Sequence, residues 1–341
     1  MAVALVALGA ACGDDLVVPT LEAVTDERLD GISVRPGLEV EVVVDGLRGP
    51  TQFLVMADGS HLVAEINGGE NDGDGRVVQV DSGGTHTVVL SGLDKPTGIA
   101  LVGQELWVME RDRLTRGPIG GDRVVVAEDL PNNGRSEGTL TVLPDGRVLF
   151  DTSGSKRGST VVDGSGRLFT VDPNDAAAGP VEYASGFKHA YAHAVDESGT
   201  VWTTEMTDGR FDELPAADEV VAVVPGEDHG WPRCVGDNRA ASEFGGTVEL
   251  CAEVPSSQAV FAPSATPTGL AVSPFSPETL WVALWNERRV VAVTADPSER
   301  PAPIGDVLTG LDRPQHLVVD GSDVLLSDFG AGTILRIAES G

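Results

Sequence analysis

From residue 39 onward, the apolar and polar positions follow a pattern that the chain repeats six times. Each copy has a Val-rich apolar run, a turn of the Gly-Leu type, a polar loop, a second apolar run, a tight turn and a third run, and a fourth run often follows. The first two copies read VVVDGLRGPTQFLVMADGSHLVAEI, from Val42, and VVLSGLDKPTGIALVGQELWVME, from Val88. Short runs that alternate or are wholly apolar are typical of β-strands, and no window has a convincing helical period.

Six copies of a four-stranded unit, about 40 to 70 residues apart, predict an all-β fold, a six-bladed β-propeller. The last copy ends after its third strand, TILRI, while the run LEVEVVV at 38–44 has no blade of its own. Pairing this run as the outer strand of the last blade closes the ring with the N-terminal strand and removes two exposed edges. We therefore predict one propeller domain over residues 39–341, a tether over 13–38 and a separate segment over 1–12.

Residues 1–12 form a short apolar segment that ends at Cys12. It is too short to span a bilayer, which needs about 20 apolar residues, and it is similar to the end of a signal sequence before a lipoprotein cysteine. Two features differ from that pattern: no Lys or Arg begins the segment, and Leu8 lies one position too far from Cys12. The segment predicts an exported, bacterial-type lipoprotein, periplasmic or at the cell surface, that contacts a membrane only through a lipid on Cys12. The alternative is a disordered tail with a free thiol.

The two other cysteines, Cys234 and Cys251, flank a loop that contains Gly and Asn. In an exported protein, an even number of remaining cysteines predicts one disulfide between them. In a reducing cytosol they would instead be two ordinary thiols.

The chain has 53 acidic and 23 basic residues, a formal charge of -30. A surface this negative repels phosphate backbones, so we expect no nucleic-acid partner; its simplest use is solubility.

The loops that precede the inner strands concentrate basic residues at one mouth of the central channel, although the chain has only three lysines. This predicted basic ring favours an anionic small-molecule ligand, and the alternative is that the side chains simply extend into solvent. The ring contains Arg48, Gln52, Lys95, Thr97, Asn132, Asn133, Arg135, Lys188, His189, His193, Ser264, Thr266, Arg313, Gln315 and His316.

The fourth copy carries the most distinctive motifs. GFKHAYAHAVDESGTVW resembles the pattern G-L-R-N-x-x-G-L-A-x-D-x-x-G-x-L-W, and DEVVAVVPGEDHGWP resembles D-E-L-N-x-I-x-P-G-x-N-Y-G-W-P. These are motifs of the soluble quinoprotein glucose/sorbosone dehydrogenase family, six-bladed propellers that use pyrroloquinoline quinone (PQQ) and calcium to oxidise sugars. Further similarity in the last two copies extends the resemblance over residues 39–338.

The resemblance implies roles for particular residues. Asp218 and Glu219 match the family's calcium-binding Asp-Glu pair, and Asp212 and Glu213 in the preceding insertion are the alternative. Lys188 and His189 match its Arg-Asn pair, which contacts quinone and sugar. The expected quinone-binding set is Gln52, Lys95, Arg135, Lys188, His189 and Arg313.

The third copy bears on catalysis. Its stretch GRSEG matches the nucleophile-elbow pattern, but an elbow requires a strand before the serine and a helix after it, which this stretch lacks. The family's catalytic histidine falls at Arg135 or Ser136, and neither is a base at neutral pH. The catalytic candidates are Arg135, which has the position, and His189, which has the chemistry; His193 and His316 are the other histidines of the ring that could supply the base. We predict PQQ- and calcium-dependent oxidation of a sugar or aldose; the alternative is a catalytically degenerate propeller that binds a small ligand or a protein partner at the channel mouth.

Overall fold

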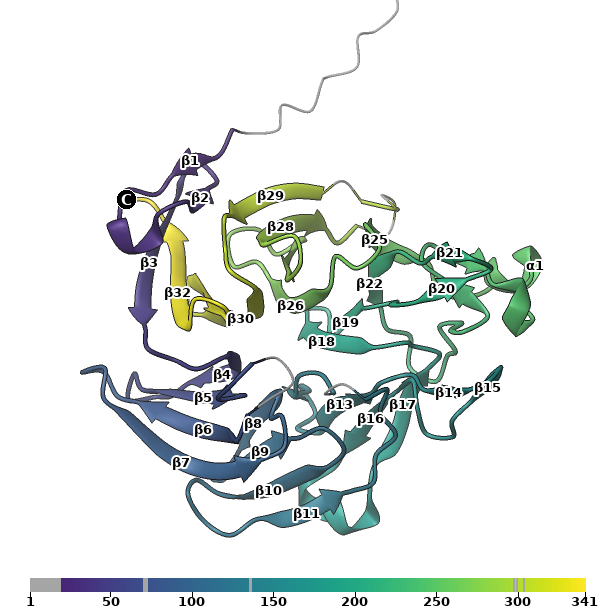
Figure 1. Ribbon diagram of the computed structural model, residues 1–341, viewed down its shortest axis with the longest axis horizontal. Coiled ribbons are helices and arrows are strands. Elements are labelled where there is room, and N and C mark those ends of the chain that lie inside the picture. Colours follow the sequence, from purple (N-terminus) through teal and green to yellow (C-terminus); the bar gives the residue numbers. More distant parts are fainter. Residues whose placement is uncertain (1–19, 70–72, 135–136, 297, 299, 303) are drawn as a thin grey trace, which may run out of the picture.

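The computed structural model describes residues 20–69, 73–134, 137–296, 298, 300–302 and 304–341. Within them, six antiparallel sheets surround a central axis (Figure 1), and the first strand of each sheet contacts its neighbours around that axis. The predicted all-β, six-bladed propeller is confirmed. The helices of the described residues are short, and none has the length and apolar composition that a membrane span requires.

Each blade contains four strands, and successive strands of a blade lie further from the axis. The first blade contains β4 (Pro50–Val55), β5 (His61–Glu65), β6 (Gly75–Val80) and β7 (His86–Leu93). The second contains β8 (Gly98–Val102), β9 (Glu105–Met109), β10 (Leu114–Pro118) and β11 (Val124–Ala127). The third contains β12 (Thr141–Val142), β13 (Val148–Thr152), β16 (Arg167–Val171) and β17 (Val181–Ser185).

The remaining blades continue this order. The fourth contains β18 (Ala190–Val195), β19 (Val201–Glu205), β22 (Asp218–Ala222) and β25 (Ser257–Phe261). The fifth contains β26 (Pro267–Val272), β27 (Thr279–Leu284), β28 (Arg289–Thr294) and β29 (Ile304–Thr309). The sixth contains β30 (Pro314–Asp320), β31 (Asp323–Asp328) and β32 (Thr333–Glu339), and β3 (Leu38–Val44) completes it.

Strand β3 closes the ring as the sequence predicts. It pairs antiparallel with β32, from Leu38 opposite Glu339 to Val44 opposite Ile334. The alternation in LEVEVVV explains the placement, because Val40 and Val44 are buried while the glutamates face outward. The pairing covers the edge that β32 would otherwise expose, and β3 becomes the outer strand of the sixth blade.

Residues 20–37 pack on the fifth blade, whereas the sequence analysis assigned them to a tether. Strand β2 (Ser33–Val34) extends the sheet beside β29, and β1 (Glu22–Ala23) pairs with β2. Between them lies the 3-10 helix Glu27–Leu29. The apolar side chains of Leu29, Ile32 and Val34 are buried in the core that the fifth and sixth blades share. Burial of this apolar surface explains why the segment joins the domain. Cys12 lies outside the described residues, so its lipidation stays a prediction.

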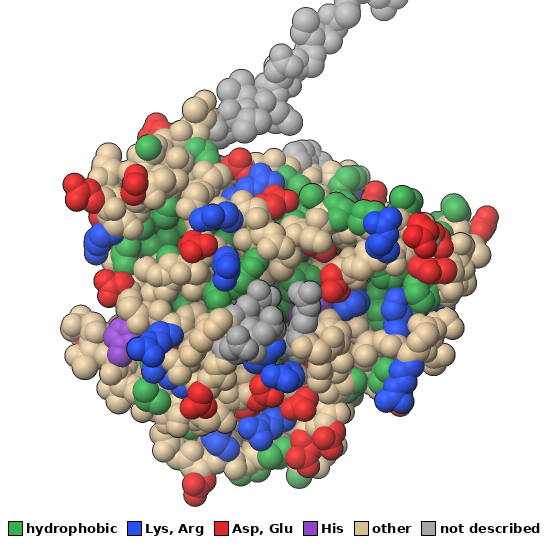
Figure 2. Space-filling view, viewed as in Figure 1, with side chains coloured by type: hydrophobic (Ala, Val, Ile, Leu, Met, Phe, Trp, Pro, Cys, Tyr) green, Lys and Arg blue, Asp and Glu red, His purple; other side chains and the backbone are tan. Residues whose placement is uncertain are grey.

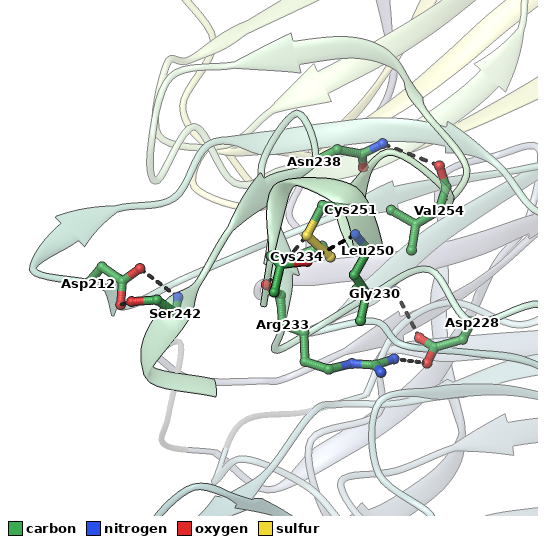
Figure 3. The surroundings of a disulfide bond; sticks show 11 residues. Asp212, Asp228, Gly230, Arg233, Cys234, Asn238, Ser242, Leu250, Cys251 and Val254 are labelled. Carbon is green, nitrogen blue, oxygen red and sulfur yellow. Dashed lines mark hydrogen bonds and ion pairs between the residues drawn. A yellow bond between two sulfur atoms is a disulfide. The ribbon is translucent and has the colours of Figure 1, made fainter. Parts of the chain in front are cut away.

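Short insertions interrupt the third and fourth blades. The third carries the hairpin β14 (Lys156–Arg157) and β15 (Thr160–Val161), together with the 3-10 helix Pro173–Ala178. The fourth carries β20 (Arg210–Phe211), β21 (Leu214–Pro215), β23 (Cys234–Val235), β24 (Arg239–Ala240), the 3-10 helix Ser242–Phe244 and α1 (Val248–Cys251). Cys234 and Cys251 form a disulfide that holds α1 against β23 (Figure 3), as the cysteine count predicts for an exported chain.

Candidate functional site

Carboxylates at the end of the second strand hold the loops that carry the predicted basic ring. In each case the carboxylate accepts a hydrogen bond from a backbone N–H in the loop before the inner strand of the same blade. The donor lies two residues before the first residue of that strand or, in the second blade, two residues before Pro96. The four pairs are Glu65 with Arg48, Glu110 with Asp94, Glu205 with Lys188, and Asp328 with Asp312. The same hydrogen bond, buried or part-buried, thus positions the mouth loop in four of the six blades, which makes these carboxylates structural.

The third blade departs from this rule. Strand β13 ends on Thr152, where β5, β19 and β31 end on Glu or Asp. Its carboxylate lies one residue earlier, at Asp151, in the fully buried run VLFDT. A second carboxylate, Glu137, precedes β12, at the position that a proline occupies in PTQF, PTGI and PTGL of other copies. Both carboxylates are turned into the protein, since each is 0% exposed.

Glu137, Asp151 and His189 form one cluster where the third and fourth blades meet. Each contributes one side-chain nitrogen or oxygen, and these three atoms lie within 4.8 Å of one another. Asp151 Oδ1 accepts the Gly138 N–H at 2.6 Å, and Glu137 accepts the Ser153 N–H at 2.5 Å. His189 Nε2 lies 3.6 Å from Asp151 Oδ2. The loop of His189 is fixed separately, because both oxygens of Glu205 accept backbone N–H groups of Lys188 and His189.

Burial and mutual repulsion make the two carboxyl groups weak acids. Burial away from water raises the pKa of Glu137, and the negative charge of an ionised Asp151 raises that pKa further. Loss of solvent likewise raises the pKa of Asp151. The Lys188 ammonium opposes the shift at Glu137, and Lys188 itself pairs with Asp208 at 2.9 Å. A cluster of this kind holds a proton or a cation at neutral pH.

The sequence analysis selected His189 but missed Glu137 and Asp151. The signal was present, because a charged residue interrupts the apolar strand VLFDT and EGTL stands where other copies have PTGL or PTGI. The other catalytic candidate, Arg135, lies outside the described residues, as does Ser136.

The basic ring is assembled only in part. Arg48 and Arg313 are exposed at the mouth, while Lys95 and Lys188 are buried. On the face shown in Figure 2, Lys and Arg side chains lie around the centre, with Asp and Glu side chains between and outside them. The Arg313 guanidinium lies 5.8 Å from the centre of the Trp285 ring, and Trp285 packs against Phe329 at 4.9 Å. This rim therefore combines free cationic groups with an aromatic face.

Gln52 does not belong to the ligand-binding ring. Its Oε1 accepts the N–H groups of Ile99 and Leu140, and its Nε2 donates to the Leu140 carbonyl. The side chain is buried, and these three bonds tie together the inner strands of the first three blades. Three of the four hydrogen bonds that this amide can make are used by backbone groups, which the sequence does not show and which disfavours the predicted contact with quinone.

The Asp-Glu pair expected to bind calcium does not converge on one point. The two oxygens of Asp218 accept the N–H groups of Thr207 and Thr266, whereas Glu219 accepts hydrogen bonds from Ser257 and from the Asp237 N–H. Adjacent residues of a strand point to opposite faces. Glu219 instead lies opposite Glu205, beside a cavity of about 20 Å³, room for about one water molecule.

The alternative calcium pair is also used locally. Asp212 accepts hydrogen bonds from the N–H and hydroxyl of Ser242 and from the Glu243 N–H, and Figure 3 shows it turned toward Ser242. Glu213 is exposed. Neither pair has the converging oxygens that calcium requires, so the residues predicted to bind it do not fit that ion.

His193 occupies a core position. It lies three residues after the start of its strand, opposite Thr203. In the first, fifth and sixth blades, the equivalent position of the inner strand is apolar: Phe53, Leu270 and Leu317. Burial lowers the pKa of His193 to about 4, and its ring nitrogens lack well-formed hydrogen bonds to described residues.

Replacing His193 by Leu is expected to reduce the loss of stability at acid pH. The fold favours the neutral ring, so the stabilisation from His193 is complete above the unfolded pKa of about 6.5 and is lost as the pH falls toward 4. The free energy of unfolding that is lost in this way is at most about 3 kcal/mol. The melting temperature of H193L should exceed that of the wild type by a margin that grows from pH 7.5 to pH 4.5. The exposed control His86→Gln should show no such growth, and a constant margin for H193L contradicts the assignment.

Comparison with known proteins supports the fold. No family model and no curated protein matches the sequence. The PQQ-bound aldose sugar dehydrogenase of Streptomyces coelicolor matches at 19% identity over 89% of this chain and 99% of that one, with a TM-score of 0.69. The PQQ domain of pyranose dehydrogenase from Coprinopsis cinerea matches at 16% identity over 90% and 97%, with a TM-score of 0.71.

A calcium structure of a carbohydrate-active enzyme of family AA12 from Trichoderma reesei matches at 16% identity over 91% of this chain and 97% of that one, with a TM-score of 0.75. At these identities the likeness shows the fold. The resemblance stated from the sequence motifs is therefore confirmed at the level of architecture.

Proposed function

We propose that this chain oxidises a hydroxyl group of a sugar at the channel mouth, with PQQ as the electron acceptor. The observation that carries the proposal is the buried cluster of Glu137, Asp151 and His189, in a fold shared with PQQ-containing sugar dehydrogenases. A soluble propeller that only needed a stable core would not place two carboxylates and an imidazole together out of water, because each is costly to bury.

The rim offers the groups that a flat, carboxylate-bearing quinone requires. Arg48 and Arg313 are exposed cations, Trp285 supplies an aromatic face beside Arg313, and Lys188 adds an ammonium. Charge-assisted hydrogen bonds from these groups would hold the cofactor's carboxylates. Its chemistry, when it is bound, is acceptance of the two electrons that leave the sugar carbon.

The chain's own residues deal with the proton. Oxidation of a sugar hydroxyl releases a proton, and we assign its acceptance to the cluster of Glu137, Asp151 and His189, through His189, the member whose side chain is partly exposed. Glu205 fixes the backbone of His189, and Gly138 fixes Asp151, so the acceptor is held in place before substrate arrives. The cluster thereby takes the role that the family assigns to a histidine of the third blade. Calcium has no step in this proposal, because the two pairs expected to bind it do not converge.

Export is also part of the proposal. A disulfide between Cys234 and Cys251 is typical of a chain that folds in an oxidising compartment. This supports the prediction that residues 1–12 act as an export signal.

Titration of the purified protein with PQQ, followed by a panel of aldoses and an electron-accepting dye, tests the function. We expect saturable quinone binding, which Lys188→Met weakens about 10- to 100-fold through loss of one charge-assisted contact. The matched control is Lys156→Met, because the Lys156 ammonium lies over the rings of Phe211 and Phe244. Absence of quinone binding overturns the proposal, and binding without turnover favours the degenerate, ligand-binding propeller.

A further inference from the structure

The cluster of Glu137, Asp151 and His189 has the composition of a metal centre. Its members come from three separate segments: the loop before β12, the strand β13 and the loop before β18. Each segment has its own backbone hydrogen bond to fix it. Glu137 and Asp151 are 0% exposed, and His189 is 5% exposed. A group assembled from two blades in this way is preorganised, and the fold pays the cost of bringing its charges together.

The distance between Asp151 Oδ2 and His189 Nε2 fits a shared ion better than a hydrogen bond. At 3.6 Å the pair is longer than an N–H···O bond, which spans about 2.7–3.2 Å. Two ligands that each lie about 2.1 Å from one ion at a tetrahedral angle are about 3.4 Å apart. Small side-chain adjustments would therefore seat an ion between them.

One carboxylate oxygen of Asp151 makes no hydrogen bond to the described residues. Oδ1 accepts the Gly138 N–H, whereas Oδ2 is buried and has no such partner. The other buried loop carboxylates differ, since both oxygens of Glu205 and of Asp218 accept hydrogen bonds. A buried carboxylate oxygen that faces an imidazole and a second carboxylate lacks one partner, and a cation would supply it.

The charges of the neighbourhood match a divalent cation. When ionised, Glu137 and Asp151 carry two negative charges. Among the described residues, the cation that acts on Glu137 is Lys188, and its ammonium already pairs with Asp208. The two charges of Glu137 and Asp151 are therefore left for a bound cation to neutralise. The donor set also selects the kind of ion, because one imidazole nitrogen and two carboxylate oxygens suit zinc or manganese, whereas calcium takes six to eight oxygens.

We propose that Glu137, Asp151 and His189 bind one divalent transition-metal ion of the Zn²⁺ or Mn²⁺ class. Three protein ligands leave a coordination position open, as in catalytic rather than structural zinc sites. The proposal stands without the proposed function: with the ion bound, its three ligands no longer accept the proton, and the ion would instead lower the pKa of a sugar hydroxyl that it contacts.

Metal titration of untagged protein, stripped with a chelator and kept free of quinone and sugar, tests the site. Calorimetry should show about one Zn²⁺ or Mn²⁺ per chain, and Co²⁺ should give visible absorption bands. Ca²⁺ and Mg²⁺ should bind at least about 10-fold more weakly, given their preference for all-oxygen sites. Asp151→Asn and His189→Gln should each lower the affinity about 100-fold or more, beyond the effect known for outer-shell partners.

Two controls make the result specific. Asp218→Asn removes a buried carboxylate that binds only backbone amides, and His86→Gln removes an exposed histidine; both should leave the stoichiometry and affinity unchanged. Far-ultraviolet circular dichroism identifies any variant that fails to fold, and His189→Gln decides if Asp151→Asn does fail. The proposal is overturned if the wild type binds no transition metal, if both ligand variants bind as tightly as the wild type, or if calcium binds best. Because neither quinone nor sugar is present, failure here is separate from failure of the sugar oxidation assay.

Discussion

Asp151→Asn is expected to lower kcat/KM for sugar oxidation by about 10²- to 10⁴-fold, the usual contribution of a positioned proton acceptor. The substitution keeps the shape of the side chain, and its amide oxygen can still accept the Gly138 N–H that holds the loop. It removes the ionisable carboxyl group that faces His189 and Glu137. Since the native carboxylate is fully buried, its loss should leave the melting temperature unchanged or slightly raised.

Asp218→Asn provides the matched comparison. Asp218 is equally buried, but both of its oxygens accept backbone N–H groups, so an amide nitrogen at one of these positions faces a donor. We expect a loss of about 1–3 kcal/mol in stability with kcat/KM retained below the melting transition. Steady-state dye reduction and thermal melts of both variants measure this contrast. If Asp218→Asn lowers turnover as much as Asp151→Asn, the reaction does not depend on the cluster of the third and fourth blades.

The architecture could be predicted from the sequence because a propeller is a repeated local pattern. Each copy marks its strands by Val-rich runs. The remaining strand, LEVEVVV, fits the vacant outer position of the last copy. The structure confirms that this strand pairs with the last blade, and it places Leu38 opposite Glu339. The repeat could not assign the segment around Leu29 and Ile32, because its strands have two residues each and carry no period. Burial against the fifth blade, a long-range contact, determines that part of the fold.

The site was less predictable because its residues are neighbours in space only. His189 belongs to a recognisable motif, but Glu137 and Asp151 stand out only as departures from the repeat. Their meeting depends on two blades packing at one angle, which no local pattern contains. The opposite error occurred at Asp218 and Glu219, where adjacency in sequence suggested shared ligation. Both lie in the strand β22, where successive side chains face opposite ways, so adjacency separates them.

Gln52 illustrates a third limit. A polar side chain near a mouth loop can form hydrogen bonds either to a ligand or to the backbone of another blade. Only the structure shows that Gln52 makes three hydrogen bonds to the backbone of Ile99 and Leu140. In a ring fold this second use is general, because inner strands bring unpaired backbone groups of neighbouring blades together near the axis. Thr51 and Thr268 do the same, donating to the carbonyls of Pro96 and Pro314.

Loss of strand β3 is expected to unfold the whole ring rather than the sixth blade alone. Without it, β32 becomes an open edge, and the apolar side chains of Leu335 and Ile337 lose the cover of Val40. The first and sixth blades then lose the covalent connection that keeps them adjacent, while Val44 no longer packs with Ile334 between them. A chain that begins at residue 45 should be insoluble or lack a cooperative melt, whereas a chain that begins at residue 20 should melt like the full protein.

Two single substitutions in β3 measure the same dependence without removing the strand. Val44 is 5% exposed and Val43 is 38% exposed, so the two neighbours differ in burial but share the strand's backbone. Val44→Ala should lower the free energy of unfolding by about 2 kcal/mol, through lost apolar contact and a residual cavity. Val43→Ala should change it by no more than about 0.5 kcal/mol. Denaturant titrations measure both values. Because the inter-blade contact belongs to the ring closure, Val44→Ala should shift the single transition of the whole domain; a separate early transition would instead show that the sixth blade unfolds independently.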